Sequence, residues 1–124
     1  MPLPPRILII SDDQWPRALL RAALIDAGHD AIGARTIDEA LEYPPNEPER
    51  GPVGLIVLDH SAMRHDGAEL QRLLDRHRVP PVLLLASAVA EPPPGPWARI
   101  ARRPVTIGDA IAAATDLLCL VRRD

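Results

Sequence analysis

The sequence predicts an α/β fold in which a parallel sheet carries helices on both faces. Two observations predict it: short runs of branched apolar residues alternate with amphipathic segments, and these runs lack a polar face. Strands buried on both sides have this composition, and such strands are typical of parallel sheets. The length of 124 residues suits one domain, which is expected to span residues 1–124.

Five short segments are expected as strands because each is apolar and is bounded by Pro, Gly or charged residues. They are residues 6–11, 30–34, 53–59, 82–86 and 98–102. The segments VGLIVLD and VLLLA, the third and fourth of the five, are apolar almost throughout. The fifth is short and is expected at an edge of the sheet.

Helical spacing of apolar residues predicts four helices between and after these strands. They are residues 14–27, 36–42, 67–77 and 107–121. Gly28 is expected to end the first helix, and Thr36 and Thr106 are expected to cap the second and the last. The apolar stripe expected on the last helix consists of Ile107, Ile111, Ala114, Leu118 and Val121.

A proline-rich stretch stands where an α/β fold places a helix between its fourth and fifth strands. Residues 91–97 read EPPPGPW, and prolines this dense exclude a regular helix. The fourth helix is therefore expected to be shortened or replaced by a loop. Trp97 either anchors this loop in the core or contacts a partner, and burial is the expectation.

Composition excludes several classes of protein. The 14 basic residues are all Arg, and the net charge of -3 gives no support for direct nucleic-acid binding. No apolar run approaches the roughly 20 residues that span a bilayer, and the start MPLPPR lacks the features of a signal peptide. A cytoplasmic protein without membrane contact is expected. The single Cys119 forms no internal disulfide and is expected in the core.

Polar residues directly follow the expected strands. Asp12 and Asp13 follow the first, Asp59 ends the third, Ser87 follows the fourth and Arg103 follows the fifth. The carboxyl ends of parallel strands meet at one edge, so these groups are expected to converge. Carboxylates this close repel one another unless a cation lies among them, and an all-oxygen set of ligands suits Mg²⁺.

The order and spacing of these residues resemble those of response-regulator receiver domains of two-component signalling. The matching segments are DD at 12–13, LDHSAMRHDGAEL at 58–70, PVLLLAS at 81–87 and RP at 103–104. The resemblance covers nearly the whole chain. It implies a flavodoxin-like, doubly wound (βα)5 sheet of five parallel strands.

The resemblance also implies a phosphorelay function. Asp59 would accept a phosphoryl group from a histidine kinase or a phosphotransfer protein, with Arg103 at the family's lysine position and Ser87 as the hydroxyl that follows the phosphoryl group. The implied ligands of Mg²⁺ are Asp12, Asp13, Asp59 and the backbone carbonyl of Ser61.

A receiver is a signalling protein rather than an enzyme, and it catalyses at most its own phosphorylation and dephosphorylation. The signal then passes to an unidentified downstream protein, and a homodimer is compatible with this function.

The chain departs from the family pattern at several positions. Arg103 replaces the lysine, and Ile100 stands where the family commonly has an aromatic residue. Counting from Pro81 without a gap places Ala86 at the hydroxyl position, and Ser87 fits only if the strand end shifts by one residue.

These departures favour a second hypothesis, a degenerate receiver that binds a protein partner without phosphorylation. Arg103 then closes the acidic end of the sheet as a structural ion pair. Asp12 and Asp13 act as helix caps, and Ser87 is a turn hydroxyl. A third hypothesis, an unrelated hydrolase, has neither a glycine-rich phosphate loop nor a GxSxG elbow to support it.

Overall fold

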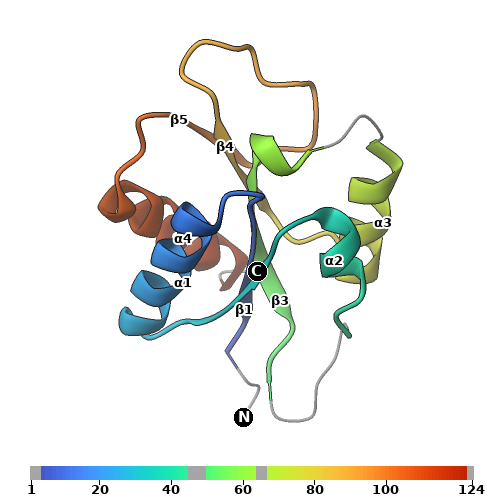
Figure 1. Cartoon of the computed structure of the whole chain (residues 1–124). Coiled ribbons are helices and arrows are strands. Elements are labelled where there is room, and N and C mark those ends of the chain that lie inside the picture. Colours follow the sequence, from blue (N-terminus) through green and yellow to red (C-terminus); the bar gives the residue numbers. More distant parts are fainter. Residues whose placement is uncertain (1–3, 45–49, 64–66, 123–124) are drawn as a thin grey trace.

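The computed structural model describes residues 4–44, 50–63 and 67–122. Five parallel strands form one sheet in the order β2-β1-β3-β4-β5 (Figure 1). They are β1 (Arg6–Ile10), β2 (Asp30–Ala34), β3 (Val53–Asp59), β4 (Val82–Ala86) and β5 (Arg99–Arg102). The strand order reverses between β1 and β3, so ligands are expected outside the carboxyl ends of these two strands. The predicted doubly wound, flavodoxin-like sheet is confirmed.

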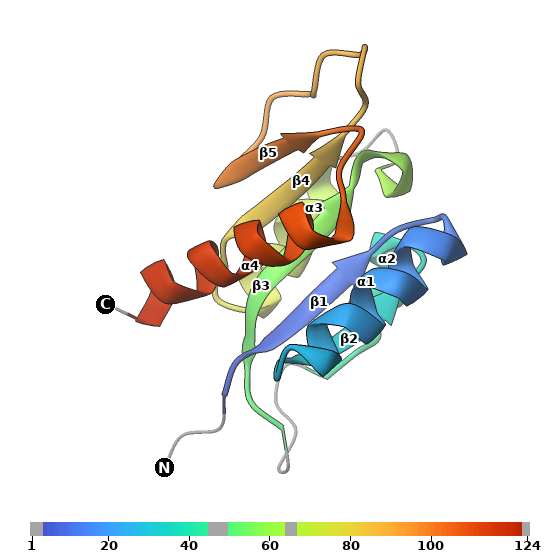
Figure 2. The same ribbon diagram turned by 90° about the vertical axis from the view of Figure 1, so that its left-hand side faces the viewer.

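Helices cover both faces of the sheet (Figure 2). The helices are α1 (Gln14–Asp26), α2 (Ile37–Leu41), α3 (Gly67–Arg76) and α4 (Ile107–Arg122), with a short 3-10 helix η1 (His60–Ala62) after β3. Helices α1 and α4 pack on one face, and α2 and α3 pack on the other. Alternate residues of the central strands enter two separate cores, which explains why these strands are apolar throughout.

The expected helix boundaries depend on local hydrogen bonds that the structure contains. Thr36 Oγ1 accepts a hydrogen bond from the Glu39 amide at 3.1 Å, and Thr106 Oγ1 accepts one from the Asp109 amide at 3.0 Å. Gly28 follows α1 with φ at +97°, a conformation that glycine adopts without steric cost. Both predicted N-caps and the predicted glycine stop are confirmed.

No helix forms in residues 87–98, between β4 and β5. The indole of Trp97 is half-buried against the core that α2 and α3 cover, and its Nε1 donates to the carbonyl of Pro93 at 2.8 Å. Trp97 therefore anchors the loop that replaces the fourth helix of the (βα)5 pattern, as predicted.

The apolar stripe predicted on α4 is confirmed at Ala114 and Leu118, which are buried, but not at Ile107. Ile107 is 37% exposed and Cys119 is also exposed, so both predictions were wrong. The buried residues are Ala110, Ala113, Ala114, Leu117 and Leu118. Three of these five buried residues are alanines, so the buried face of the helix consists mostly of small side chains. The side chain of Val121 lies outside the described part of the chain.

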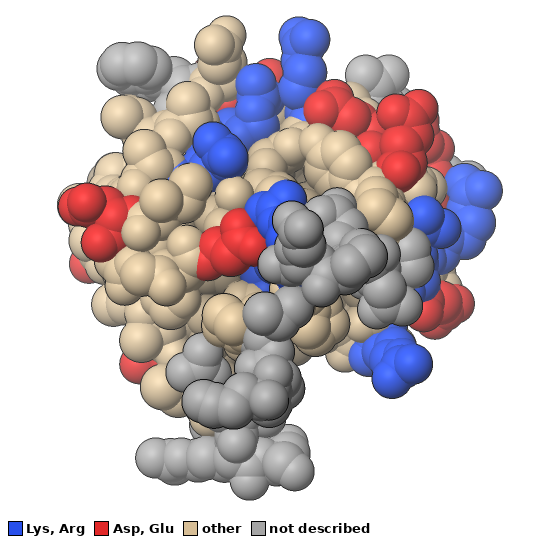
Figure 3. All heavy atoms as spheres, turned by 90° about the horizontal axis from the view of Figure 1, so that it is seen from below, with Lys and Arg blue, Asp and Glu red and all other residues tan. Residues whose placement is uncertain are grey.

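On the face at the amino ends of the strands, the arginines and the acidic residues of the described chain are interspersed (Figure 3). In the same described ranges, every helix falls short of the length and apolarity that crossing a membrane requires.

Candidate functional site

Asp59 lies at the carboxyl end of β3 and is only 1% exposed. Its Oδ1 accepts a hydrogen bond from the Ser61 amide at 3.1 Å, because Asp59 is the N-cap of η1. Its Oδ2 accepts a hydrogen bond from Ser11 Oγ at 3.0 Å and one from a guanidinium nitrogen of Arg103. Both oxygens of a buried carboxylate are thus satisfied, as burial of a charge requires.

Arg103 reaches Asp59 from the residue that follows β5. Its backbone amide donates to the carbonyl of Ala86 at 3.0 Å, which fixes its position beside the end of β4. Its side chain is 42% exposed, so one side of the ion pair with Asp59 faces solvent. The structure therefore brings together the expected acceptor and the residue at the lysine position.

A cavity of about 300 Å³ opens over Asp59, and its other lining residues are His60, Ser61, Ser87 and Arg103. The sequence placed Ser87 near this site only by a shift of one residue, and the cavity includes it. The Ser87 hydroxyl also accepts hydrogen bonds from the amides of Val89 and Ala90, at 3.2 and 3.3 Å. Ser87 is therefore both a turn hydroxyl and a group beside Asp59.

Asp12 and Asp13 follow β1, the strand next to β3, and both are exposed. Ser11 links this segment to the site, since its hydroxyl accepts from the Asp13 amide at 3.3 Å and donates to Asp59. The oxygen donors at this edge have the chemistry that Mg²⁺ prefers. The described residues nevertheless contain no group of three or more His, Cys, Asp or Glu side chains arranged around a common metal position. The predicted ligand set stays a prediction.

Two contacts at the site were absent from the sequence analysis. Ser11 was not assigned a role, although its hydroxyl binds Asp59. Arg17 Nη1 donates to the Ser11 carbonyl at 2.6 Å and so holds the end of β1 in place. The position of Ser11 directly after an apolar strand was an available signal, whereas nothing in the spacing indicated Arg17.

Several solved structures share this fold. A CheY-like receiver domain from Methanospirillum hungatei has a TM-score of 0.76 at 20% identity, covering 96% of this chain and 98% of its own. The receiver domain of the Francisella response regulator 1452 has a TM-score of 0.71 at 21% identity, with coverage of 94% and 98%. The non-phosphorylated HemR receiver domain from Leptospira biflexa has a TM-score of 0.70 at 21% identity, with coverage of 92% and 94%. The chain thus has the fold of a CheY-like response-regulator receiver domain.

One curated protein is similar in sequence. Protein PetR of Rhodobacter capsulatus is 37% identical over an alignment of 90 residues that covers 68% of this chain and 34% of PetR. The chain therefore spans about a third of the length of this relative. No protein-family model matches the sequence.

Proposed function

We propose that the chain is a phosphorelay receiver that accepts a phosphoryl group on Asp59. The observation that carries the proposal is the position of Asp59, a buried carboxylate at the end of a central strand that lines a cavity and contacts a guanidinium. In the transfer, a carboxylate oxygen attacks the phosphorus of a phosphohistidine. The P–N bond breaks, an acyl phosphate forms on Asp59, and the histidine nitrogen that leaves takes up a proton.

The neighbouring groups suit this reaction. Arg103 moves its hydrogen bond from the carboxylate to the phosphoryl oxygens, which a guanidinium binds with two parallel donors. The Ser61 amide holds the carboxylate in its orientation, and the Ser87 hydroxyl lies in the same cavity as a donor to the new phosphoryl group.

The donors at this edge of the sheet are proposed to hold Mg²⁺. The residues are Asp12, Asp13, Asp59 and the carbonyl of Ser61. When bound, Mg²⁺ supplies positive charge that neutralises the phosphoryl oxygens.

The proposed phosphodonor is a histidine kinase or a phosphotransfer protein. A mostly apolar cavity of about 440 Å³ lies between α1 and the start of α4, and it shares Arg103 with the cavity over Asp59. A protein seated there, against residues such as Ala88 and Ile107, lies beside the ion pair of Arg103 and Asp59. This adjacency supports docking of the donor at this face.

A second candidate function is binding of a protein partner without phosphorylation. It is favoured by the ion pair that Arg103 already forms with Asp59 and by the loop that replaces the fourth helix. Under this hypothesis the ion pair is a permanent structural element.

Incubation with acetyl phosphate and Mg²⁺, followed by intact-mass measurement, tests the proposal. We expect a gain of one phosphoryl group that disappears in Asp59→Asn and is reduced when Mg²⁺ is chelated. The matched control is Asp75→Asn, on the exposed side of α3, which keeps the full gain. Absence of an adduct on the wild-type chain would support the second function instead.

A further inference from the structure

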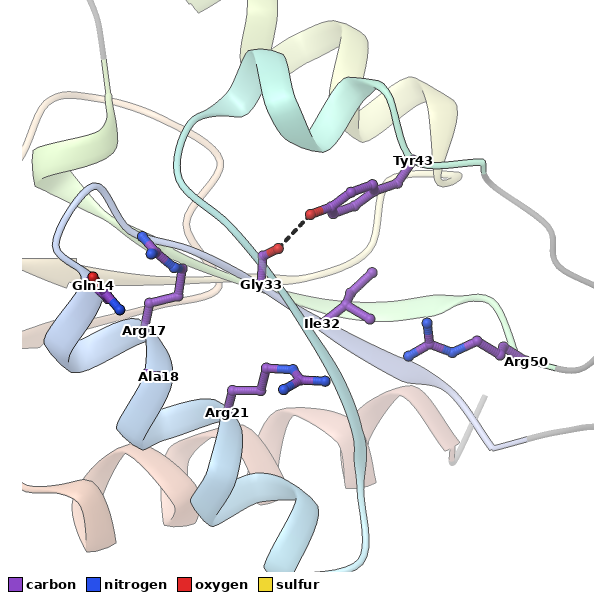
Figure 4. A pocket seen from close by; sticks show the side chains of 8 residues that line it. All are labelled: Gln14, Arg17, Ala18, Arg21, Ile32, Gly33, Tyr43 and Arg50. Carbon is purple, nitrogen blue, oxygen red and sulfur yellow. Dashed lines mark hydrogen bonds between the residues drawn. The ribbon is translucent and has the colours of Figure 1, made fainter.

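A third cavity, of about 520 Å³, lies at the outer edge of β2, on the far side of β1 from Asp59 (Figure 4). Three arginines line it: Arg17 and Arg21 come from α1, and Arg50 comes from the segment before β3. Tyr43 and Ile32 also line the cavity. The chain is acidic overall, so three guanidinium groups around one cavity are a marked local departure.

The local sequence positions these arginines. Arg17 and Arg21 are one helical turn apart and therefore project from the same side of α1. A Cβ on Gly33 would lie 3.3 Å from Cγ of Arg17, so the glycine makes room for the arginine stem against β2. Arg21 Nε also donates to the carbonyl of Ala31 at 3.0 Å. The stem of Arg17 thus lies against β2 while its Nη1 donates to the Ser11 carbonyl, and Arg21 is fixed to the strand by its Nε although its side chain is exposed.

The edge of β2 is closed to a further strand. The Ala31 carbonyl accepts from Arg21, and the Gly33 carbonyl accepts from the Tyr43 hydroxyl at 2.5 Å (Figure 4). Capped carbonyls of this kind prevent an added peptide strand from pairing with the edge. The cavity above this edge is therefore better suited to a small molecule than to a peptide.

The charged residues in the described lining of the cavity are all arginines. Asp30 forms two hydrogen bonds with Arg50, at 2.5 and 3.0 Å, and Glu39 lies 3.4 Å from the Tyr43 hydroxyl. Neither carboxylate belongs to the lining that the structure describes, which contains no acidic residue. Guanidinium groups from separate segments that surround one cavity favour an anion with several oxygen atoms.

We propose that this cavity binds a phosphate-bearing small molecule of nucleotide size. Its volume lies within the range of about 300 to 1,000 Å³ that is typical of small-molecule sites. The arginines contact the phosphate oxygens, while Ile32 and the ring of Tyr43 provide a surface for an apolar or aromatic part of the ligand. This site is separate from Asp59 and does not depend on phosphorylation.

Titration of the ¹⁵N-labelled chain with ADP, pyrophosphate and adenosine in the presence of EDTA tests the proposal. We expect saturable binding of ADP and pyrophosphate, with amide shifts concentrated at Ala18, Ile32 and Gly33, and much weaker binding of adenosine. Equal affinity for ADP and pyrophosphate would show that the phosphate groups alone are recognised. Tighter binding of ADP would add recognition of the ring. Shifts confined to His60 and Ser87 would place the ligand at the other cavity and overturn the proposal.

Variants measured by calorimetry provide the second part of the test. Arg21→Gln and Arg50→Gln are each expected to weaken binding of ADP about tenfold, since each removes a charged donor to phosphate. Arg72→Gln on the exposed side of α3 makes the same charge change outside the cavity and is expected to leave the affinity unchanged. No saturable binding at millimolar concentrations, or equal affinity in all three variants, would overturn the proposal. If one cavity variant fails to fold, the other variant and the amide shifts of the wild-type chain still test whether the ligand binds in this cavity.

Discussion

Arg103 and Asp59, 44 residues apart in the chain, form an ion pair in which the carboxylate is buried and the guanidinium is partly exposed. The protein therefore supplies its own cation at the end of β3. Any phosphoryl group that reaches Asp59 must share this cation or displace it. The pair stabilises the buried charge, and Arg103 also lines the cavity that opens over Asp59.

Removal of Arg103 is expected to destabilise the fold. Arg103→Ala leaves a buried carboxylate with only Ser11 and Ser61 as partners, and we expect a loss of about 2 kcal/mol in the free energy of unfolding. This is below the cost for fully buried pairs because the guanidinium is partly exposed. Urea unfolding measures the loss. In an Asp59→Asn background the loss is expected to be much smaller, and equal losses in both backgrounds would show that the ion pair contributes nothing.

His77 is expected to make the stability depend on pH. Burial lowers the pKa of His77 from 6.5, assisted by the charges of Arg76 and Arg6. The unfolded chain therefore binds a proton more readily than the folded chain. The free energy of unfolding should fall as the pH is lowered from about 7 through 6.5.

Urea titrations at several pH values measure this dependence. His77→Leu is expected to flatten the profile in this range, and His29→Leu is the control that leaves His77 in place. A wild-type profile that rises on acidification through this range would contradict the prediction.

Gly28 is expected to be sensitive to substitution for a purely conformational reason. Its φ is +97°, and nothing lies within 4 Å of a Cβ placed there. Gly28→Ala should therefore cost about 1 kcal/mol from backbone strain alone. Gly67→Ala is the matched control, because the helical Gly67 also has open space and its φ lies outside the strained positive range. Thermal unfolding should separate the two variants, and equal melting temperatures would rule out the strain.

Trp97 is expected to hold the loop between β4 and β5. Trp97→Phe removes the hydrogen bond to Pro93 and should cost about 1 kcal/mol. Trp97→Ala also removes packing against the core and should cost about 2 kcal/mol or more. Limited proteolysis should cut within residues 87–98 faster in the alanine variant. Unchanged cleavage there would show that the indole does not restrain the loop.

The sequence was sufficient where residue character alone determines structure. The bounds of β3 and β4 agree with prediction because both strands are apolar on two faces and end at polar residues. The predicted buried face of α4 was correct at Ala114 and Leu118 and wrong at Ile107, where a large apolar side chain at the start of the helix was taken as a sign of burial. Ala110 and Ala113, which were outside the predicted stripe, are buried as well, and Ile107 and Cys119 lie at the surface.

The candidate site, too, contains features that the sequence predicted and features that it did not. Convergence of Asp59 and Arg103 followed from parallel strands ending at one edge, and the structure contains this pair. The links from Arg17 to Ser11 and from Ser11 to Asp59 join side chains of different elements. Such contacts depend on how α1 lies against the sheet, which no local pattern specifies.

The helix-free connection between β4 and β5 has a thermodynamic consequence. Each proline in EPPPGPW narrows the backbone angles open to the chain before folding begins, so less entropy is lost when the segment takes its final path. A segment without the backbone hydrogen bonds of a helix can thus be anchored by the single ring of Trp97. The restricted unfolded chain therefore adds to the stability of this segment, beside the contacts that the segment makes in the folded protein.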